Sequence, residues 1–217
     1  MRARGCRPAS APLKHQDLLG RQQLQSGSVR TRVRHELDVA SSDTLLLFVG
    51  SGFKTKGLDR ALFGLAHLPS ELKAQTQLVV VGQDQARPYL RLAQKLGVVD
   101  RVHFLGGRTD IPDLLAAGDL LIHPAYMENT GTILLEAIAA GLPVIATDVC
   151  GYADHIVKAV AGTVLASPFD QEELNHELAH ALLSAERTAW SQNGQRYGAD
   201  PSLYHMPASA VDAIESV

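Results

Sequence analysis

The stretch HPAYMENTGTILLEAIAAGLPVI, which runs from His123 to Ile145, contains two glutamates eight positions apart with a glycine between them. Apolar residues gather only after Gly131, so we predict a loop that carries Glu128 and a helix that begins near Gly131 and carries Glu136. The free N–H groups and the positive dipole end of such a helix start attract anions, phosphate groups above all. We interpret the stretch as one half of a sugar-nucleotide site.

The end of that helix and the alternation around it predict the fold class. Gly141 can take the positive φ of a residue just past a helix end, and Pro143 prevents continuation. Short apolar runs alternate with loops and helical patterns, at 45–49, 78–81, 102–105, 120–122, 144–146 and 163–165. Such runs indicate a buried parallel sheet. We therefore predict an α/β fold, a doubly wound, Rossmann-like parallel sheet of about six strands with helices on both faces and a ligand beyond the carboxyl ends of the strands.

Composition limits the class of protein. The 217 residues suffice for one domain with a substantial core, and 46% are hydrophobic against 20% charged. A net charge of −3 gives no reason to expect nucleic acid as a partner. Cys6 and Cys150 form no disulfide framework, which indicates a reducing cytosol. No apolar run reaches the roughly 18 residues of a membrane span, and the basic start lacks the apolar core of a secretory signal.

The first 34 residues differ from the rest of the chain. They hold seven arginines and one lysine against a single acid, Asp17, with hardly any apolar pattern. We expect a basic, disordered arm at 1–34, which is either a solvated tail or a segment in contact with an acidic membrane surface. The globular domain is then expected at 35–217.

The segment GSGFKTKG, residues 50–57, is a second candidate for phosphate binding. It joins a predicted strand to a predicted helix and offers Gly52, Lys54 and Lys56 at the helix start. Leu58 stands where the Walker pattern needs lysine, and the glycine spacing does not fit the dinucleotide fingerprint. From these residues alone, phosphate binding and a plain glycine-rich connection with surface lysines both remain open.

Three interpretations of Glu128 and Glu136 are open from the spacing. They are an acid/base pair, two ligands for sugar hydroxyls, or an exposed loop acid beside an ordinary helix acid. Eight residues that include a turn from loop to helix can place both carboxylates on the ligand side, where each grips a different part of one elongated molecule. His123 ends a predicted strand just before this loop and is a weaker candidate.

The C-terminal third is predicted to be helical, with Asp170 as N-cap and Glu173 completing a capping box. It contains His176, Glu177 and His180, which match the H-E-x-x-H pattern of zinc peptidases. The helical period turns both histidines away from the apolar stripe and toward solvent, whereas a zinc site would face a cleft. We therefore expect no metal at this segment. The stripe consists of Leu174, Leu178, Ala181, Leu182 and Ala185.

Several segments together resemble the C-terminal, donor-nucleotide half of the retaining GT-B glycosyltransferases of family four. They are, in order and spacing, GSGFKTKGLDRAL, VVVGQD, the run from DRVHFLGG to GYADHI, and LYHMP at 203–207. The likeness covers about 45–217, and the paired glutamates (E-x7-E) followed by GLPV are its most specific part. Within the family it is strongest to members that transfer glucose from UDP-glucose to the heptose of the lipopolysaccharide inner core.

The resemblance implies a role for each matching residue. Glu128 matches the first glutamate of the family, which lies beside the donor sugar and is the catalytic candidate, and Glu136 matches the second, which holds the ribose. Gly131 and Thr132 match positions whose backbone meets the diphosphate. Lys56 matches a phosphate-binding lysine. Arg108 matches a loop position near the base, and Asn129 and Thr130 are weaker candidates.

The sequence departs from the family pattern at two points. Thr55 stands where many relatives carry arginine, so one positive charge is lost, and Lys54 is a candidate to compensate. The family also builds its cleft between two domains, and the 34-residue arm has no counterpart of the N-terminal acceptor domain. Because glycosyl transfer needs the acceptor hydroxyl placed beside the anomeric carbon, we expect the chain alone to transfer little or nothing.

The primary hypothesis is a metal-independent donor domain that needs no cofactor. Its expected partners are a UDP-sugar, the lipopolysaccharide core and a separate acceptor domain, and it is expected in the cytoplasm, with peripheral contact to the inner face of the inner membrane. The alternatives are a non-catalytic binding or assembly module, or truncated product, and, distantly, a zinc metallopeptidase.

Overall fold

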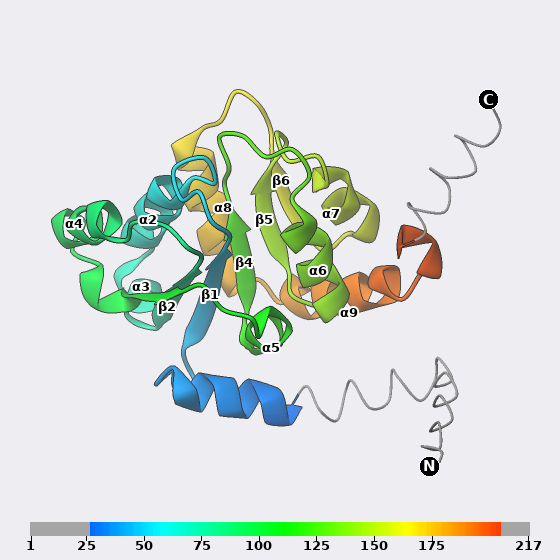
Figure 1. Ribbon diagram of the computed structural model, residues 1–217, viewed down its shortest axis with the longest axis horizontal. Helices are drawn as coiled ribbons and strands as arrows, with labels where there is room; N and C mark the ends of the chain where they lie inside the picture. The colour runs from blue at the N-terminus through cyan, green and yellow to red at the C-terminus, as the bar shows by residue number, and fades with distance from the viewer. Residues whose placement is uncertain (1–26, 205–217) are drawn as a thin grey trace, which may run out of the picture.

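The computed structural model describes residues 27–204, and Figure 1 shows the central sheet with helices on both sides. The sheet is parallel and has the strand order β3-β2-β1-β4-β5-β6. Its strands are β1 (Thr44–Val49), β2 (Thr76–Val81), β3 (Val102–Gly106), β4 (Leu120–His123), β5 (Val144–Thr147) and β6 (Gly162–Leu165). The predicted six-stranded, doubly wound parallel sheet is confirmed.

The strand order places the predicted loops side by side. The chain winds one way from β1 through β2 to β3 and then returns to start the other half at β4, next to β1. Leu46 of β1 pairs with Leu120 of β4, so the loops that follow these two strands leave the same edge of the sheet. Ligands of open α/β sheets bind at such a reversal of strand order. The fold therefore brings the glycine loop and the two-acid loop together.

Both faces of the sheet are buried, which explains the continuous apolar runs. Along β1, Leu45 and Leu47 pack into one core, whereas Leu46 and Phe48 pack into the other. The first core is covered by α5 (Ile111–Ala117), α6 (Thr132–Ala140) and α7 (Ala153–Ala159). The second is covered by α2 (Leu58–His67), α4 (Arg87–Lys95) and α8 (Gln171–Leu183). The chain also forms α3 (Ser70–Ala74), α9 (Glu186–Gly198) and the short turns η1 (Val99–Arg101) and η2 (Pro201–Tyr204).

The predicted boundary at residue 34 is wrong, because residues 27–36 form a helix that packs beneath the sheet (Figure 1). Val33 of this helix is buried in the first core, and the Arg34 side chain is 6% exposed. Arg30 and Arg34 both pair with Asp119, which precedes β4. The positive charges that suggested an arm therefore have a partner distant in sequence. Residues 1–26, and the 205–207 part of LYHMP, lie outside the described residues.

The capping box predicted for α8 does not form. The Asp170 side chain accepts a hydrogen bond from the backbone N–H of Glu172 (2.9 Å), so Asp170 is the N-cap as predicted, without a return bond from Glu173. Within residues 27–204, no helix has the length and apolar character needed to span a membrane.

Candidate functional site

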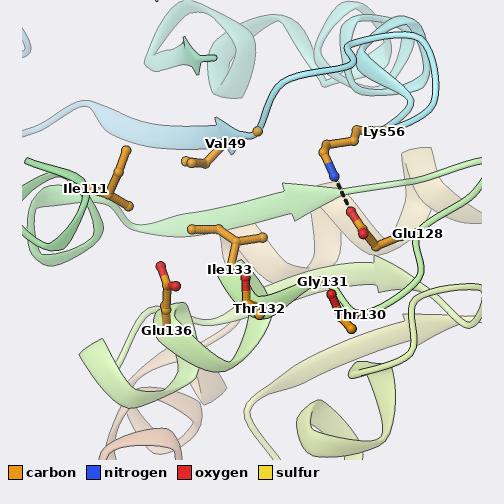
Figure 2. A pocket seen from close by; sticks show the side chains of 10 residues that line it. Val49, Lys56, Ile111, Glu128, Thr130, Gly131, Thr132, Ile133 and Glu136 are labelled. Atoms are coloured by element: carbon orange, nitrogen blue, oxygen red, sulfur yellow. Dashed lines mark hydrogen bonds and ion pairs between the residues drawn. The ribbon is translucent and has the colours of Figure 1, made fainter. Parts of the chain in front are cut away.

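A cavity of about 260 Å³ lies where the loops after β1 and β4 meet the start of α6. Figure 2 shows the side chains that surround it. Polar groups at both ends and apolar groups between them give it an elongated, amphipathic lining. The lining residues are Val49, Gly50, Lys56, Ile111, Glu128, Thr130, Gly131, Thr132, Ile133 and Glu136.

The start of α6 opens directly into this cavity. Gly131 is its N-cap with φ of 76°, a conformation that residues with a side chain rarely adopt, and no side chain caps the helix. Thr132 and Ile133 in the first turn line the cavity. Uncapped N–H groups and the helix dipole give this side of the cavity a positive backbone potential. At the other end Gly141, with φ of 77°, terminates the helix as predicted.

Lys56 and Glu128 form an ion pair across one end of the cavity (Figure 2). The two side chains are 20% and 12% exposed, so the pair is largely shielded from water. A Cβ at Gly50 would lie 2.7 Å from Cδ of Lys56, which means that the glycine leaves room for the lysine stem. Burial alone would raise the pKa of Glu128, but Lys56 and His123 outweigh it and hold that pKa below its ordinary value. Glu128 is therefore ionised at neutral pH.

Glu136 lies at the opposite end of the cavity. Its carboxylate points toward Ile111, and Thr132 and Ile133 separate it from the Lys56–Glu128 pair (Figure 2). Glu136 is exposed and takes part in no ion pair within the described residues. The structure thus brings both predicted carboxylates to one elongated cavity, with the helix start between them.

Other predicted residues do not line this cavity. Arg108 donates from Nε and Nη2 to both carboxylate oxygens of Asp110, at 2.8 and 2.6 Å, so its guanidinium is held locally. Lys54 and Asn129 are exposed. Thr55 donates from Oγ1 to the carbonyl oxygen of Gly52 (2.9 Å), where Gly52 has φ of 79°. These residues shape the rim and the loops.

The loops after β1 and β4 are tied together by backbone and side-chain contacts. The carbonyl oxygen of Thr55 accepts hydrogen bonds from the N–H groups of Tyr126 (2.8 Å) and Met127 (3.2 Å). Arg60 lies between two aromatic rings, 3.5 Å from the centroid of Tyr126 and 3.6 Å from that of Phe169. It also donates to the carbonyl oxygens of Pro124 and Ala125, at 3.1 and 2.9 Å. No sequence signal marked Arg60, because its partners lie on remote segments.

Arg60→Ala is expected to lower the free energy of unfolding by about 2 kcal/mol, because it removes two cation–π contacts and two charged hydrogen bonds. Urea unfolding followed by circular dichroism measures the change. Arg91→Ala, at an exposed position of α4, is the matched control, with an expected change below about 0.5 kcal/mol. Equal effects of the two substitutions would contradict the assigned role.

His123 lies at the end of β4, close to Glu128. Its ring is fully buried and stacks on Phe48, with centroids 6.3 Å apart and planes inclined by 22°. Its Nε2 lies 3.4 Å from Oε2 of Glu128, close but without hydrogen-bond geometry, and neither ring nitrogen has a hydrogen-bond partner among the described residues. Burial, assisted by Lys56, lowers the pKa of His123 from 6.5 to about 4, so the ring is neutral at pH 7.

This lowered pKa makes stability depend on pH. As the pH falls below 6.5 the unfolded chain takes up a proton at His123, whereas the folded chain does not until about pH 4. The unfolded state therefore binds more protons in this window, and stability decreases as the pH falls. Between pH 7 and pH 5 the parent should lose about 1 to 2 kcal/mol more than His123→Leu in urea unfolding. Parallel pH profiles of the two proteins would be inconsistent with a neutral, buried His123.

The H-E-x-x-H segment faces solvent. His176 and His180 are exposed on α8, with parallel rings 6.4 Å apart. Leu174 and Leu178 are buried, as are Ala181 and Leu182, which confirms most of the predicted stripe, but Ala185 lies beyond the end of α8 and is exposed. Within the described residues, no three metal-ligating side chains gather at one point.

The parallel sheet, the reversal between β1 and β4, and the uncapped helix start at the cavity together define a doubly wound α/β domain with a candidate anion-binding site. Residues 29–197 match the family of glycosyl transferases group 1. The chain belongs to this family. The predicted donor-half likeness is therefore confirmed at the level of the family.

Relatives and solved structures refine the likeness. The chain is 50% identical over 182 residues to lipopolysaccharide glucosyltransferase WaaG of Escherichia coli K12, covering 83% of this chain and 49% of WaaG. A crystal structure of WaaG superposes with a TM-score of 0.82, at 49% identity over 86% of this chain and 50% of that one. Anabaena Alr3699/HepE in complex with UDP-glucose superposes with a TM-score of 0.76, at 26% identity over 88% of this chain and 53% of that one. The chain therefore spans about half the length of these proteins.

Sequence reasoning did not single out three of the residues that line the cavity. Val49 is the last residue of β1, Ile111 begins α5, and Ile133 lies in the first turn of α6. The signal that could have found them is positional, since every one stands where a strand ends or a helix begins on the ligand edge of the sheet.

Proposed function

We propose that this chain is the donor half of a retaining hexosyltransferase, which moves glucose from UDP-glucose to the heptose of the lipopolysaccharide inner core. The observation that carries the proposal is the cavity with an uncapped helix start at its centre and a carboxylate at each end. The name of the E. coli relative and the UDP-glucose complex of HepE support the donor and the pathway.

The diphosphate would lie against the start of α6. Its negative charge matches the N–H groups of the first turn, and Lys56 would move from Glu128 to the phosphate oxygens. These groups then stabilise the charge that develops on UDP as the glycosidic bond breaks, without a divalent cation in our proposal. The positive charge comes from the chain itself.

The two carboxylates would contact different parts of the donor. Glu136, exposed at the far end, would accept hydrogen bonds from the ribose hydroxyls. Glu128, ionised and next to Lys56, would contact the sugar and stabilise positive charge near the anomeric carbon. Arg108 would reach the base only by leaving Asp110.

We propose that transfer also needs an acceptor-binding domain beside this edge of the sheet, and that the reaction takes place in the cytoplasm at the inner face of the inner membrane. The second candidate is a non-catalytic binding or assembly module that offers the same cavity without carrying out transfer. Transfer of radiolabelled glucose to a heptose-terminated core by this chain alone would exclude the module.

Isothermal titration with UDP tests the donor site. The parent should bind UDP, in the presence or absence of EDTA, and Glu136→Ala should weaken binding about tenfold by removing hydrogen bonds to the ribose. Glu173→Ala, an exposed acid on α8, is the control and should leave the affinity unchanged. Absence of UDP binding at millimolar concentration, or equal affinity of Glu136→Ala and the parent, would contradict the proposal.

A further inference from the structure

His123 is exceptional among the buried polar side chains of the described residues. Buried polar groups nearly always have hydrogen-bond partners, because leaving one unsatisfied is costly. Each of the other buried polar side chains takes part in at least one hydrogen bond, whereas neither nitrogen of His123 does. Those others are Arg34, Thr76, Thr147 and Asn175.

A carboxylate of the site lies close to the His123 ring. Its Nε2 lies 3.4 Å from Oε2 of Glu128, and the same oxygen forms the ion pair with Lys56. Oε1 of Glu128 has no hydrogen-bond partner within residues 27–204. One carboxylate oxygen is therefore held from the protein side, and the other is free for a ligand.

Stacking on Phe48 fixes the plane of the His123 ring, and the end of β4 fixes its position. A neutral imidazole has a single N–H, and an acceptor oxygen of Glu128 lies 3.4 Å from Nε2, which favours the tautomer with the proton on Nε2. A short shift of the Glu128 side chain toward the sheet would complete this hydrogen bond.

We propose that His123 is a positioning residue for Glu128, whose carboxylate it holds through Nε2–H once Lys56 has turned to the diphosphate. The inference rests on the proposed donor site, because it requires a bound diphosphate to draw Lys56 away. Its role concerns the sugar end of the donor, since Glu128 is the carboxylate at that end. UDP, which lacks the sugar, should bind without its help.

Three substitutions separate this role from simple packing. In His123→Gln, the side-chain amide nitrogen takes a place similar to that of Nε2, whereas in His123→Asn it corresponds to Nδ1, and His123→Leu offers volume without a donor. Titrations of each variant with UDP and with UDP-glucose are compared with the parent. The thermal midpoint of each variant is recorded to verify folding.

His123→Leu and His123→Asn should weaken UDP-glucose binding about tenfold and leave the affinity for UDP within about twofold of the parent. His123→Gln should keep the affinity for UDP-glucose within about threefold of the parent. Equal affinity of His123→Gln and His123→Asn for UDP-glucose would overturn the inference. So would a loss of affinity in His123→Leu that is the same for UDP and for UDP-glucose. If His123→Leu does not fold, the difference in UDP-glucose affinity between His123→Gln and His123→Asn tests the inference. A parent that binds UDP but shows no contrast among variants refutes only this inference, whereas a parent that does not bind UDP refutes the donor site and the inference with it.

Discussion

Lys56→Met is expected to lower the affinity for UDP about 100-fold, the largest effect of any single side chain in the cavity. Among the described residues that line the cavity, Lys56 is the only basic one. Arg108 lies outside the lining and is paired with Asp110. The substitution removes a charged contact to phosphate and also leaves Glu128 without its cation, so that its charge repels the diphosphate. Both effects act in the same direction.

Isothermal titration with UDP measures this loss. Lys95→Met, at the exposed end of α4, changes the net charge equally and serves as the control, with an expected change below about twofold. If Lys56→Met binds UDP within about threefold of the parent, the phosphate is not where we place it.

Gly57→Ala is expected to lower the free energy of unfolding by about 4 kcal/mol, because it combines backbone strain with a steric overlap. Gly57 has φ of 75°, which costs a residue with a Cβ about 1 to 2 kcal/mol. A Cβ at this position would also overlap the carbonyl oxygen of Pro124, so the glycine loop and the Glu128 loop could not keep their present contact. We expect UDP binding to be lost together with stability.

Gly97→Ala isolates the backbone part of this effect. Gly97 has φ of 69°, but a Cβ there would meet nothing within 4 Å, so only the cost of about 1 to 2 kcal/mol applies. Urea unfolding of the two variants, followed by Trp190 fluorescence, gives the difference. Equal destabilisation would show that the approach of Gly57 to Pro124 is not tight in solution.

The sheet and the α6 boundaries could be predicted because their signals are local. Apolar runs buried on both faces identify strands, and Gly131 and Gly141 delimit α6 because their positive φ favours glycine. The short helix α3 was missed, since it has five residues and buries none of them.

The sequence could not reveal which side chains contact one another in the folded chain. The basic residues Arg30 and Arg34 suggested a solvated arm because their partner, Asp119, lies 89 and 85 residues away. Arg108, which the resemblance assigns to a loop near the base, pairs with Asp110, two residues on. Likewise, no sequence pattern indicates that the His123 ring lies close to Glu128 without a hydrogen bond to it.

Amide chemical shifts test the central claim most directly, because they report on the backbone that should meet the diphosphate. The 23.3 kDa chain can be labelled with ¹⁵N and titrated with UDP. The amides of Gly131, Thr132 and Ile133 should shift with a common saturating isotherm, and should not do so in Lys56→Met at the same concentrations. Unchanged shifts at these three residues, with saturating shifts elsewhere in the protein, would contradict the account.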